Sequence, residues 1–224
     1  LLSRSMCLCR KSFAVGPTGD GTEALLAFTW NPNPKKNDFV FVYDYNLYYQ
    51  ADPEKPATAR QLTKDGSYLL RYGVPDWLYE EEILASGDAI WWSESGNFMA
   101  YLRFDDRAVN RIYIPKYLRS SQYPLYMEIP YPKAGVEENP KAELYIHSVA
   151  THHAVVVEPP AELTAMNQSY YVFSNQWLRM PARVRRALGE ERLATVWSNR
   201  EQNLLYVTLC NEVDCILVNH SSRI

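Results

Sequence analysis

The sequence lacks several features that would assign a function directly. It has no run of about 18 apolar residues, so no segment of it is predicted to span a membrane. It has no Gly-x-Ser-x-Gly nucleophile motif, and none of its 4 histidines has a fitting serine partner, so no catalytic residue is expected among these positions. The net charge of −3 disfavours nucleic acid as a partner.

Metal and cofactor motifs are also sparse. Cys7-x-Cys9 has no second pair at a metal-binding spacing, and His152-His153 are predicted to point to opposite faces of one strand. Asp105-Asp106 is predicted to form a turn, or an ion pair with Arg103 or Arg107, in preference to binding calcium. We therefore expect no metal site and no cofactor.

Aromatic residues are abundant, with 17 Tyr, 6 Trp and 7 Phe, and this enrichment favours strands over helices. Three segments repeat one pattern, in which a strand ends in Trp, a polar turn follows, and a second strand carries an aromatic residue. They begin at Trp30, Trp92 and Trp197. A β-propeller blade takes about 40–50 residues, so the first interval predicts one blade with an insertion and the second about two blades. We expect the three tryptophans to lie in blade cores.

Further strands are predicted between and around these repeats, with the alternation of half-buried strands. Glu143–Val149 and Ala154–Val157 are expected to be the outer strands of the next blade. The other candidates are Tyr45–Tyr49, Arg111–Ile114 and Tyr126–Ile129. These patterns predict an all-β fold of about three to four propeller blades.

Two stretches interrupt the β pattern. In the first, Asp76-Trp77-Leu78-Tyr79-Glu80-Glu81-Glu82-Ile83-Leu84, three glutamates stand among large apolar residues, and Asp76 can cap a short helix. Because adjacent carboxylates repel, the cluster predicts a site for a cation such as an amine, a guanidinium or a metal. The second, Pro181 to Leu193, is rich in arginine and is predicted to be a solvated inserted loop or short helix, a basic binding surface being the alternative.

Cysteines and sequons give a weak indication of compartment. Cys210 and Cys215 flank a four-residue turn between strand candidates, where a disulfide is geometrically plausible; two free thiols are the alternative. Glycosylation sequons begin at Asn167 and Asn219. Together they favour a secreted or lumenal protein.

The chain resembles the propeller domain of the dipeptidyl peptidase IV family. The resemblance is carried by Gly73-Val74-Pro75-Asp76-Trp77-Leu78-Tyr79-Glu80-Glu81-Glu82, Trp91-Trp92-Ser93, Phe98-Met99-Ala100-Tyr101, Gln122-Tyr123-Pro124, Ile129-Pro130-Tyr131-Pro132-Lys133-Ala134-Gly135 and Asn139-Pro140. It is specific from about residue 28 to 160 and weaker from 170 to 215. Residues 28–224 are therefore assigned to a partial propeller domain, residues 1–27 match poorly, and residues 179–192 are expected to be an insertion.

The resemblance implies an eight-bladed propeller seated on an α/β-hydrolase domain. A short propeller helix would carry Glu81 and Glu82, which in the active members bind the N-terminal amine of a peptide substrate, while Glu80 would shape the turn. Trp77 and Tyr79 would pack the helix down. The α/β-hydrolase domain would be a partner of these residues in the intact protein, and a homodimer and an extracellular or plasma-membrane location are further expectations.

Inactive members of the family keep the same glutamates, so the motif does not decide between a peptidase and a non-catalytic subunit bound to a membrane protein. A truncated product without activity is a third reading. Because the first residue is Leu, we expect the chain to be part of a longer protein, or else an unusual splice product or a faulty gene assembly. With unpaired blade edges, the chain alone is expected to be marginally stable or to aggregate.

Overall fold

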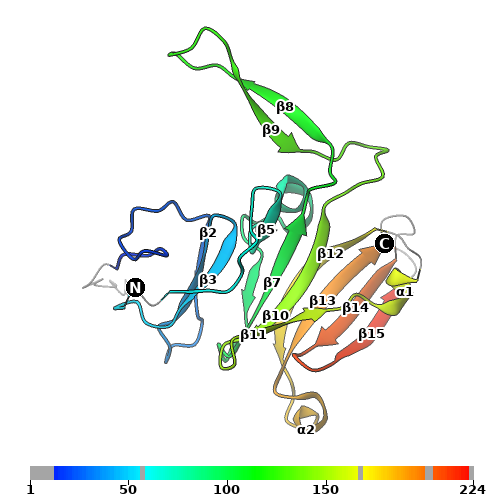
Figure 1. The fold of residues 1–224 in the computed structure, drawn as a ribbon. Helices are drawn as coiled ribbons and strands as arrows, with labels where there is room; N and C mark the ends of the chain where they lie inside the picture. The colour runs from blue at the N-terminus through cyan, green and yellow to red at the C-terminus, as the bar shows by residue number, and fades with distance from the viewer. Residues whose placement is uncertain (1–12, 56–58, 166–168, 200–203, 222–224) are drawn as a thin grey trace, which may run out of the picture.

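Three antiparallel sheets dominate the computed structural model, which describes residues 13–55, 59–165, 169–199 and 204–221 (Figure 1). The first sheet has the order β1-β2-β3-β4 and the third β12-β13-β14-β15. In the middle sheet β11, β10 and β7 follow one another, and β5 and β6 both pair with β7. The three sheets correspond to three propeller blades, so the predicted all-β partial propeller of about three to four blades is confirmed.

The strands of the first blade are β1 Ala27–Trp30, β2 Phe39–Tyr43, β3 Asn46–Gln50 and β4 Arg60–Gln61. Those of the middle blade are β5 Leu70–Tyr72, β6 Ile90–Trp92, β7 Phe98–Asp105, β10 Lys141–Ser148 and β11 His153–Val157. Those of the third blade are β12 Tyr170–Arg179, β13 Glu191–Asn199, β14 Leu205–Cys210 and β15 Cys215–Ser221. Two short helices, α1 Ala161–Thr164 and α2 Arg185–Leu188, lie in connections.

A two-stranded hairpin, β8 Arg111–Lys116 and β9 Leu125–Pro130, separates β7 from β10. Its strands pair only with each other among the described strands, and Figure 1 shows it projecting away from the three blades. We call residues 111–130 the arm.

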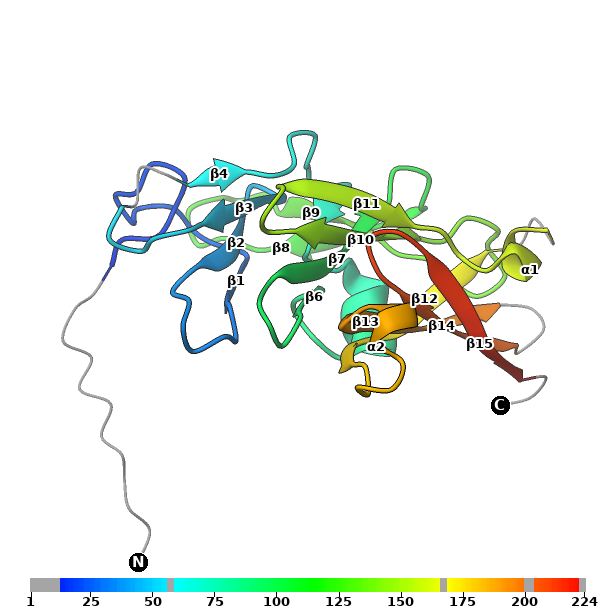
Figure 2. The ribbon, with the colours of Figure 1, turned by 90° about the horizontal axis from the view of Figure 1, so that it is seen from below.

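The core lies between neighbouring blades, because β7 presents alternate side chains to its two sides. Met99 and Tyr101 belong to the apolar cluster shared with the first blade, which includes Val40 and Leu47. Ala100, Leu102 and Phe104 belong to the cluster shared with the third blade, which includes Trp197 and Tyr206. The view in Figure 2 shows the three sheets stacked side by side in this order.

Polar side chains in the connecting turns join the blades. Asn31 donates from Nδ2 to the carbonyl oxygen of Gly96 at 2.9 Å, and Lys36 donates from Nζ to the same oxygen at 2.8 Å. Gly96 has a φ of +66°, and a Cβ there would lie 1.8 Å from Asn31 Oδ1, so only glycine fits. Ser95 donates from its backbone N and from Oγ to the carboxylate of Glu191, which joins the middle and third blades.

Two predictions about blade spacing are wrong. The interval from Trp92 to Trp197 contains one blade step and the arm, because the arm consumes residues without adding a strand to any blade. For the same reason β10 and β11 are outer strands of the blade that contains Trp92 and do not form the next blade.

The three tryptophans also differ from one another. Trp197 is fully buried, as expected, but it lies inside β13, which continues to Asn199. Trp30 is 48% exposed, so its prediction as a core residue is wrong. It ends β1, the edge strand of its sheet, and packs against Phe28 and Phe39. Trp92 is half-buried.

The arginine-rich stretch is the tip of the hairpin between β12 and β13, with Arg179 opposite Glu191. It contains the single turn of α2. Arg192 departs from the solvated reading: it is 1% exposed, it donates from Nη2 to Asp214 Oδ1 at 2.7 Å, and it donates from Nε to the carbonyl of Leu188. It lies in β13, where the side chain points inward, so it joins the hairpin tip to the turn between β14 and β15.

Candidate functional site

The glutamates lie on a short helix, η2 Tyr79–Leu84, that interrupts the innermost strand of the middle blade. On one side of the interruption β5 pairs with β7 through Leu70 opposite Asp105, and on the other β6 pairs with it through Ile90 opposite Tyr101. The two half-strands therefore fix both ends of the segment 73–89. A helix held at both ends in this way keeps a defined position relative to the blade.

Asp76 closes the N-terminal end of this helix. Its Oδ1 accepts hydrogen bonds from the backbone N–H groups of Leu78 at 2.8 Å and Tyr79 at 3.2 Å, and its backbone carbonyl accepts from the N–H of Glu80 at 2.9 Å. A carboxylate in this place satisfies donors that a helix start leaves free. At the other end Ala85 adopts a left-handed conformation, with φ of 50°, and stops the helix.

Two aromatic side chains attach the helix to the body of the molecule. Tyr79 is fully buried, its ring lies 4.8 Å from that of Phe104, and its hydroxyl accepts a hydrogen bond from the N–H of Val172 at 3.3 Å. Burial raises the pKa of Tyr79, so the phenol stays neutral. The ring of Trp77 lies 4.3 Å from that of Tyr131, at the base of the arm. These contacts agree with the expectation that both aromatic residues pack the helix down.

Glu80, Glu81 and Glu82 are all exposed, and no hydrogen bond or ion pair joins their carboxylates to any other described residue. The helix has π geometry, in which the wider turn reduces the angle between successive side chains, so Glu81 and Glu82 project in more similar directions than in an α-helix. π-helical turns occur frequently at functional sites. Two adjacent, unpaired carboxylates on a fixed support can bind one cation through two charge-assisted hydrogen bonds.

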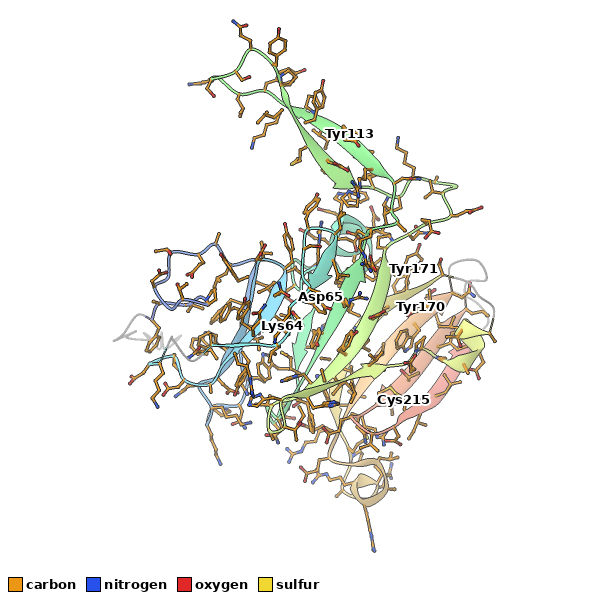
Figure 3. All side chains as sticks on the ribbon, in the orientation of Figure 1. Lys64, Asp65, Tyr113, Tyr170, Tyr171 and Cys215 are labelled. Carbon is orange, nitrogen blue, oxygen red and sulfur yellow. A yellow bond between two sulfur atoms is a disulfide. The ribbon has the colours of Figure 1, made fainter. Side chains whose placement is uncertain are left out.

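The described residues among the other predicted site residues lie in the third blade. Cys210 and Cys215 face each other across β14 and β15 and form a disulfide (Figure 3). The backbone of Asn219 lies in β15 opposite Val207. Asn167, Cys7 and Cys9 lie outside the described residues.

The structure differs from the prediction for the histidine pair and agrees with it for the aspartate pair. His152 lies in the turn before β11, with φ of 56°, so it and His153 are not consecutive strand residues as predicted. Asp105 forms the expected ion pair, with Arg107 Nη2 at 2.6 Å and Arg103 Nη2 at 3.9 Å. No group of three potential metal ligands occurs in the part of the chain that the structure describes.

Asp106 is a feature that sequence reasoning missed. It is completely buried, and neither oxygen of its carboxyl group has a hydrogen-bond partner. Burial, and after it the nearby charge of Asp76, raise its pKa to about 7. Its position beside a charged, exposed neighbour gave no sign of burial, although β alternation after Phe104 would have placed it on the inner face.

No helix within the described ranges combines the length and the apolar character that a membrane crossing requires.

Three comparisons with known proteins bear on what the glutamate helix does. The family model for the dipeptidyl peptidase IV (DPP IV) N-terminal region matches residues 10–223. Among curated proteins, the chain is similar to dipeptidyl peptidase family member 2 of Caenorhabditis elegans, with 54% identity over 203 residues, which cover 91% of this chain and 24% of that protein.

It is also similar to inactive dipeptidyl peptidase 10 of Mus musculus, with 33% identity over 76% of this chain and 20% of that protein. Among solved structures, dipeptidyl peptidase 4 of Porphyromonas gingivalis superposes with a TM-score of 0.71 at 24% identity, over 89% of this chain and 26% of that one. The chain thus spans about a fifth to a quarter of the length of these proteins.

Proposed function

We propose, from the premise that the chain belongs to the dipeptidyl peptidase IV family as part of its N-terminal region, that it recognises substrate for a serine-type dipeptidyl peptidase. Glu81 and Glu82 bind the N-terminal ammonium of a peptide, and an α/β-hydrolase domain outside these residues cleaves it. The observation that carries the proposal is the pair of exposed, unpaired carboxylates on a helix fixed by Asp76 and Tyr79.

The chemistry of this helix allows it to act as a ruler that sets the distance from the peptide amine to the bond that is cleaved. Carboxylates accept charge-assisted hydrogen bonds from an ammonium group, and such bonds are roughly twice as strong as neutral ones. Because the helix is anchored to two blades, it fixes the amine at one distance from a nucleophile held by the neighbouring domain. A peptide anchored by its amine presents only one bond at that distance, and positioning of this kind lowers the entropic part of the barrier. We propose that this distance selects the bond after the second residue, so that N-terminal dipeptides are released.

The test replaces both glutamates with glutamine in the intact protein, and the matched control is Glu80→Gln. Each charge-assisted hydrogen bond contributes about 1.5–3 kcal/mol, so Glu81→Gln with Glu82→Gln should lower kcat/KM for dipeptide release by about 10²-fold or more. The control should stay within about threefold of wild type. Unchanged dipeptide release in the double variant would refute the proposal.

Blocking the substrate amine gives an independent readout. An N-acetylated peptide has no ammonium for the glutamates, so wild type should cleave it poorly and the double variant should lose the preference for the free amine. If both enzymes discriminate between free and blocked peptides to the same extent, another part of the protein binds the amine.

A non-catalytic subunit that binds a membrane protein is the second candidate, and the similarity to a protein named inactive dipeptidyl peptidase 10 favours it. The sequence that follows Ile224 in the transcript separates the two. A downstream Gly-x-Ser-x-Gly supports the peptidase, and a continuation without the serine supports the binding subunit. A transcript that ends at Ile224 would leave a propeller remnant.

We also propose that the arm is the contact surface of a homodimer. Tyr113, Tyr117, Tyr123 and Tyr126 of the arm are all more than 60% exposed, and Figure 3 shows Tyr113 away from the blades. An isolated two-stranded ribbon is marginally stable in water, so it gains from packing against a second copy. Sedimentation of the intact protein with Tyr113→Lys plus Tyr126→Lys should show a shift towards monomer. An unchanged dimer would place the contact elsewhere.

An extracellular or plasma-membrane location completes the proposal. The Cys210–Cys215 disulfide supports it, because disulfides persist in oxidising compartments. Treatment of the protein from its native cells with an N-glycosidase should reduce its apparent mass through Asn167 or Asn219. If Asn167→Gln and Asn219→Gln each leave the apparent mass equal to that of wild type, neither sequon is glycosylated.

A further inference from the structure

Two buried carboxyl groups lie behind the glutamate helix. Asp76 is 2% exposed, and while its Oδ1 caps the helix, its Oδ2 is buried without a hydrogen-bond partner. Asp106 is completely buried, and both of its oxygens lack partners. The backbone N–H of Asp106 donates to the carbonyl of Leu69 next to β5, so the end of β7 is held against the strand that leads into Asp76.

The charges around this pair do not neutralise two carboxylates. Arg71 of β5 is the cation that acts on both, yet its Nε donates to the carbonyl of Tyr68 and its Nη1 to that of Pro75 at 3.0 Å. Its guanidinium also lies over the ring of Tyr68. Asp105 adds a further negative charge beside Asp106, and Tyr79 beside Asp76 is neutral. Within the described ranges, neither Asp76 nor Asp106 forms an ion pair with Arg71.

We propose that Asp76 and Asp106 are positioning residues for the amine-binding glutamates and hold one proton between them. Asp106 carries the proton, so that Asp76 stays ionised and caps the helix without a second buried negative charge behind it. When Asp106 loses the proton, repulsion between the two carboxylates loosens the cap, and the glutamates lose their fixed position. The inference deepens the proposed function and rests on it.

The direction of the pH effect follows from where the proton binds. Asp106 has a pKa of about 7 in the folded protein, above its ordinary value of 3.8, so the folded state holds more protons between these values. Stability therefore falls as pH rises from about 4 to 7, and the deficit remains above pH 7. Binding of an ammonium by Glu81 and Glu82 should weaken over the upper part of the same range.

The experiment measures the Kd of a non-hydrolysable dipeptide analogue with a free amine, from pH 6 to pH 8, for the intact protein. Asp106→Asn mimics the protonated residue permanently, and Asp88→Asn, an exposed residue after the helix, is the control. The ratio of Kd at pH 8 to Kd at pH 6 should be about fivefold larger or more in wild type and the control than in Asp106→Asn. Titration of the ligand's own amine cancels in this comparison.

A second variant separates positioning from simple loss of packing. Asn also caps helices, so Asp76→Asn keeps the cap but removes the repelling charge, and the pH transition should move to lower pH. The thermal midpoint of each variant over the same pH range reports the proton without any ligand, and its dependence on pH should flatten in Asp106→Asn. Superimposed profiles of wild type and Asp106→Asn in both measurements overturn the inference.

The same assay distinguishes failure of the positioning role of Asp106 from failure of amine binding by Glu81 and Glu82. If Glu81→Gln with Glu82→Gln weakens binding while the Asp106→Asn profile equals that of wild type, the inference fails and the proposed function stands. If the double glutamate variant binds the amine as wild type does, the proposed function fails and the inference fails with it.

Discussion

The glutamate helix and the arm both interrupt the middle blade, but the helix buries an aromatic side chain and the arm leaves its aromatic side chains exposed. The helix enters within the innermost strand, between β5 and β6, and buries Tyr79 completely. The arm enters between β7 and β10, and Tyr113 on it is 63% exposed. Both segments are short excursions from the same sheet. The difference in burial of their aromatic residues therefore depends on what each segment contacts in the folded protein, and not on its distance from the blade strands in sequence.

The comparison separates a site from a contact surface. A segment whose aromatic residues pack into the chain's own core has a fixed position, so its polar side chains point in a defined direction. Such a segment suits the precise binding of a small cation. A segment whose aromatic side chains remain exposed can bury them against another surface. Such a segment suits an interface with a partner. The two segments meet at one point, where Trp77 contacts Tyr131.

The largest expected effect comes from separating the three blades from the rest of the protein. The chain produced alone should aggregate or melt without a cooperative transition, because its outer blades keep unpaired edges and Trp30 remains half exposed. Removing residues 112–129 of the arm should not rescue it, if the blade edges and not the arm cause the association. Size-exclusion chromatography with thermal unfolding checks this, and a monodisperse, cooperatively melting chain would contradict it.

The next effect compares one aromatic residue from each segment. Tyr79→Ala removes a fully buried ring and should lower the free energy of local opening of the helix by about 3–5 kcal/mol. Tyr113→Ala removes an exposed ring and should change stability by less than about 0.5 kcal/mol. Hydrogen exchange of the intact protein, followed at the amides of residues 79–84, gives both values.

Tyr79→Phe is the control for the hydroxyl group. It keeps the ring against Phe104 but leaves the N–H of Val172 without its partner, so it should cost about 1–3 kcal/mol. Equal effects of Tyr79→Ala and Tyr113→Ala would show that the helix is not anchored through this ring.

Much of the blade architecture could be predicted from the sequence, because strand alternation and turn residues are local. Trp30 and Trp92 mark strand ends as expected, and the short helix Tyr79–Leu84 lies within the stretch where it was expected, although its π geometry was not foreseen. The assignment of strands to blades could not be predicted, because pairing is non-local: nothing in residues 111–130 distinguishes a self-paired arm from two strands of a blade.

The candidate site was predictable only where residue type alone carries the chemistry. Glu81 and Glu82 stand out because three consecutive carboxylates among apolar residues are costly without a cation. Asp106 and Arg192 were missed because their burial depends on β7 and β13 lying between other strands, which a single sequence does not reveal. Both residues stand beside other charged residues in the sequence, which made them look solvated.

The smallest expected effect lies at the meeting point of the two segments. A double-mutant cycle with Trp77→Ala and Tyr131→Ala should give a coupling energy of about 0.5–1.5 kcal/mol, the value typical of an aromatic pair at this separation. Measured on the opening of the helix by hydrogen exchange, a coupling in this range means that the base of the arm helps to hold the glutamates in place. Additive effects of the two substitutions would mean that the arm and the helix are independent, and that a partner bound to the arm leaves amine binding unchanged.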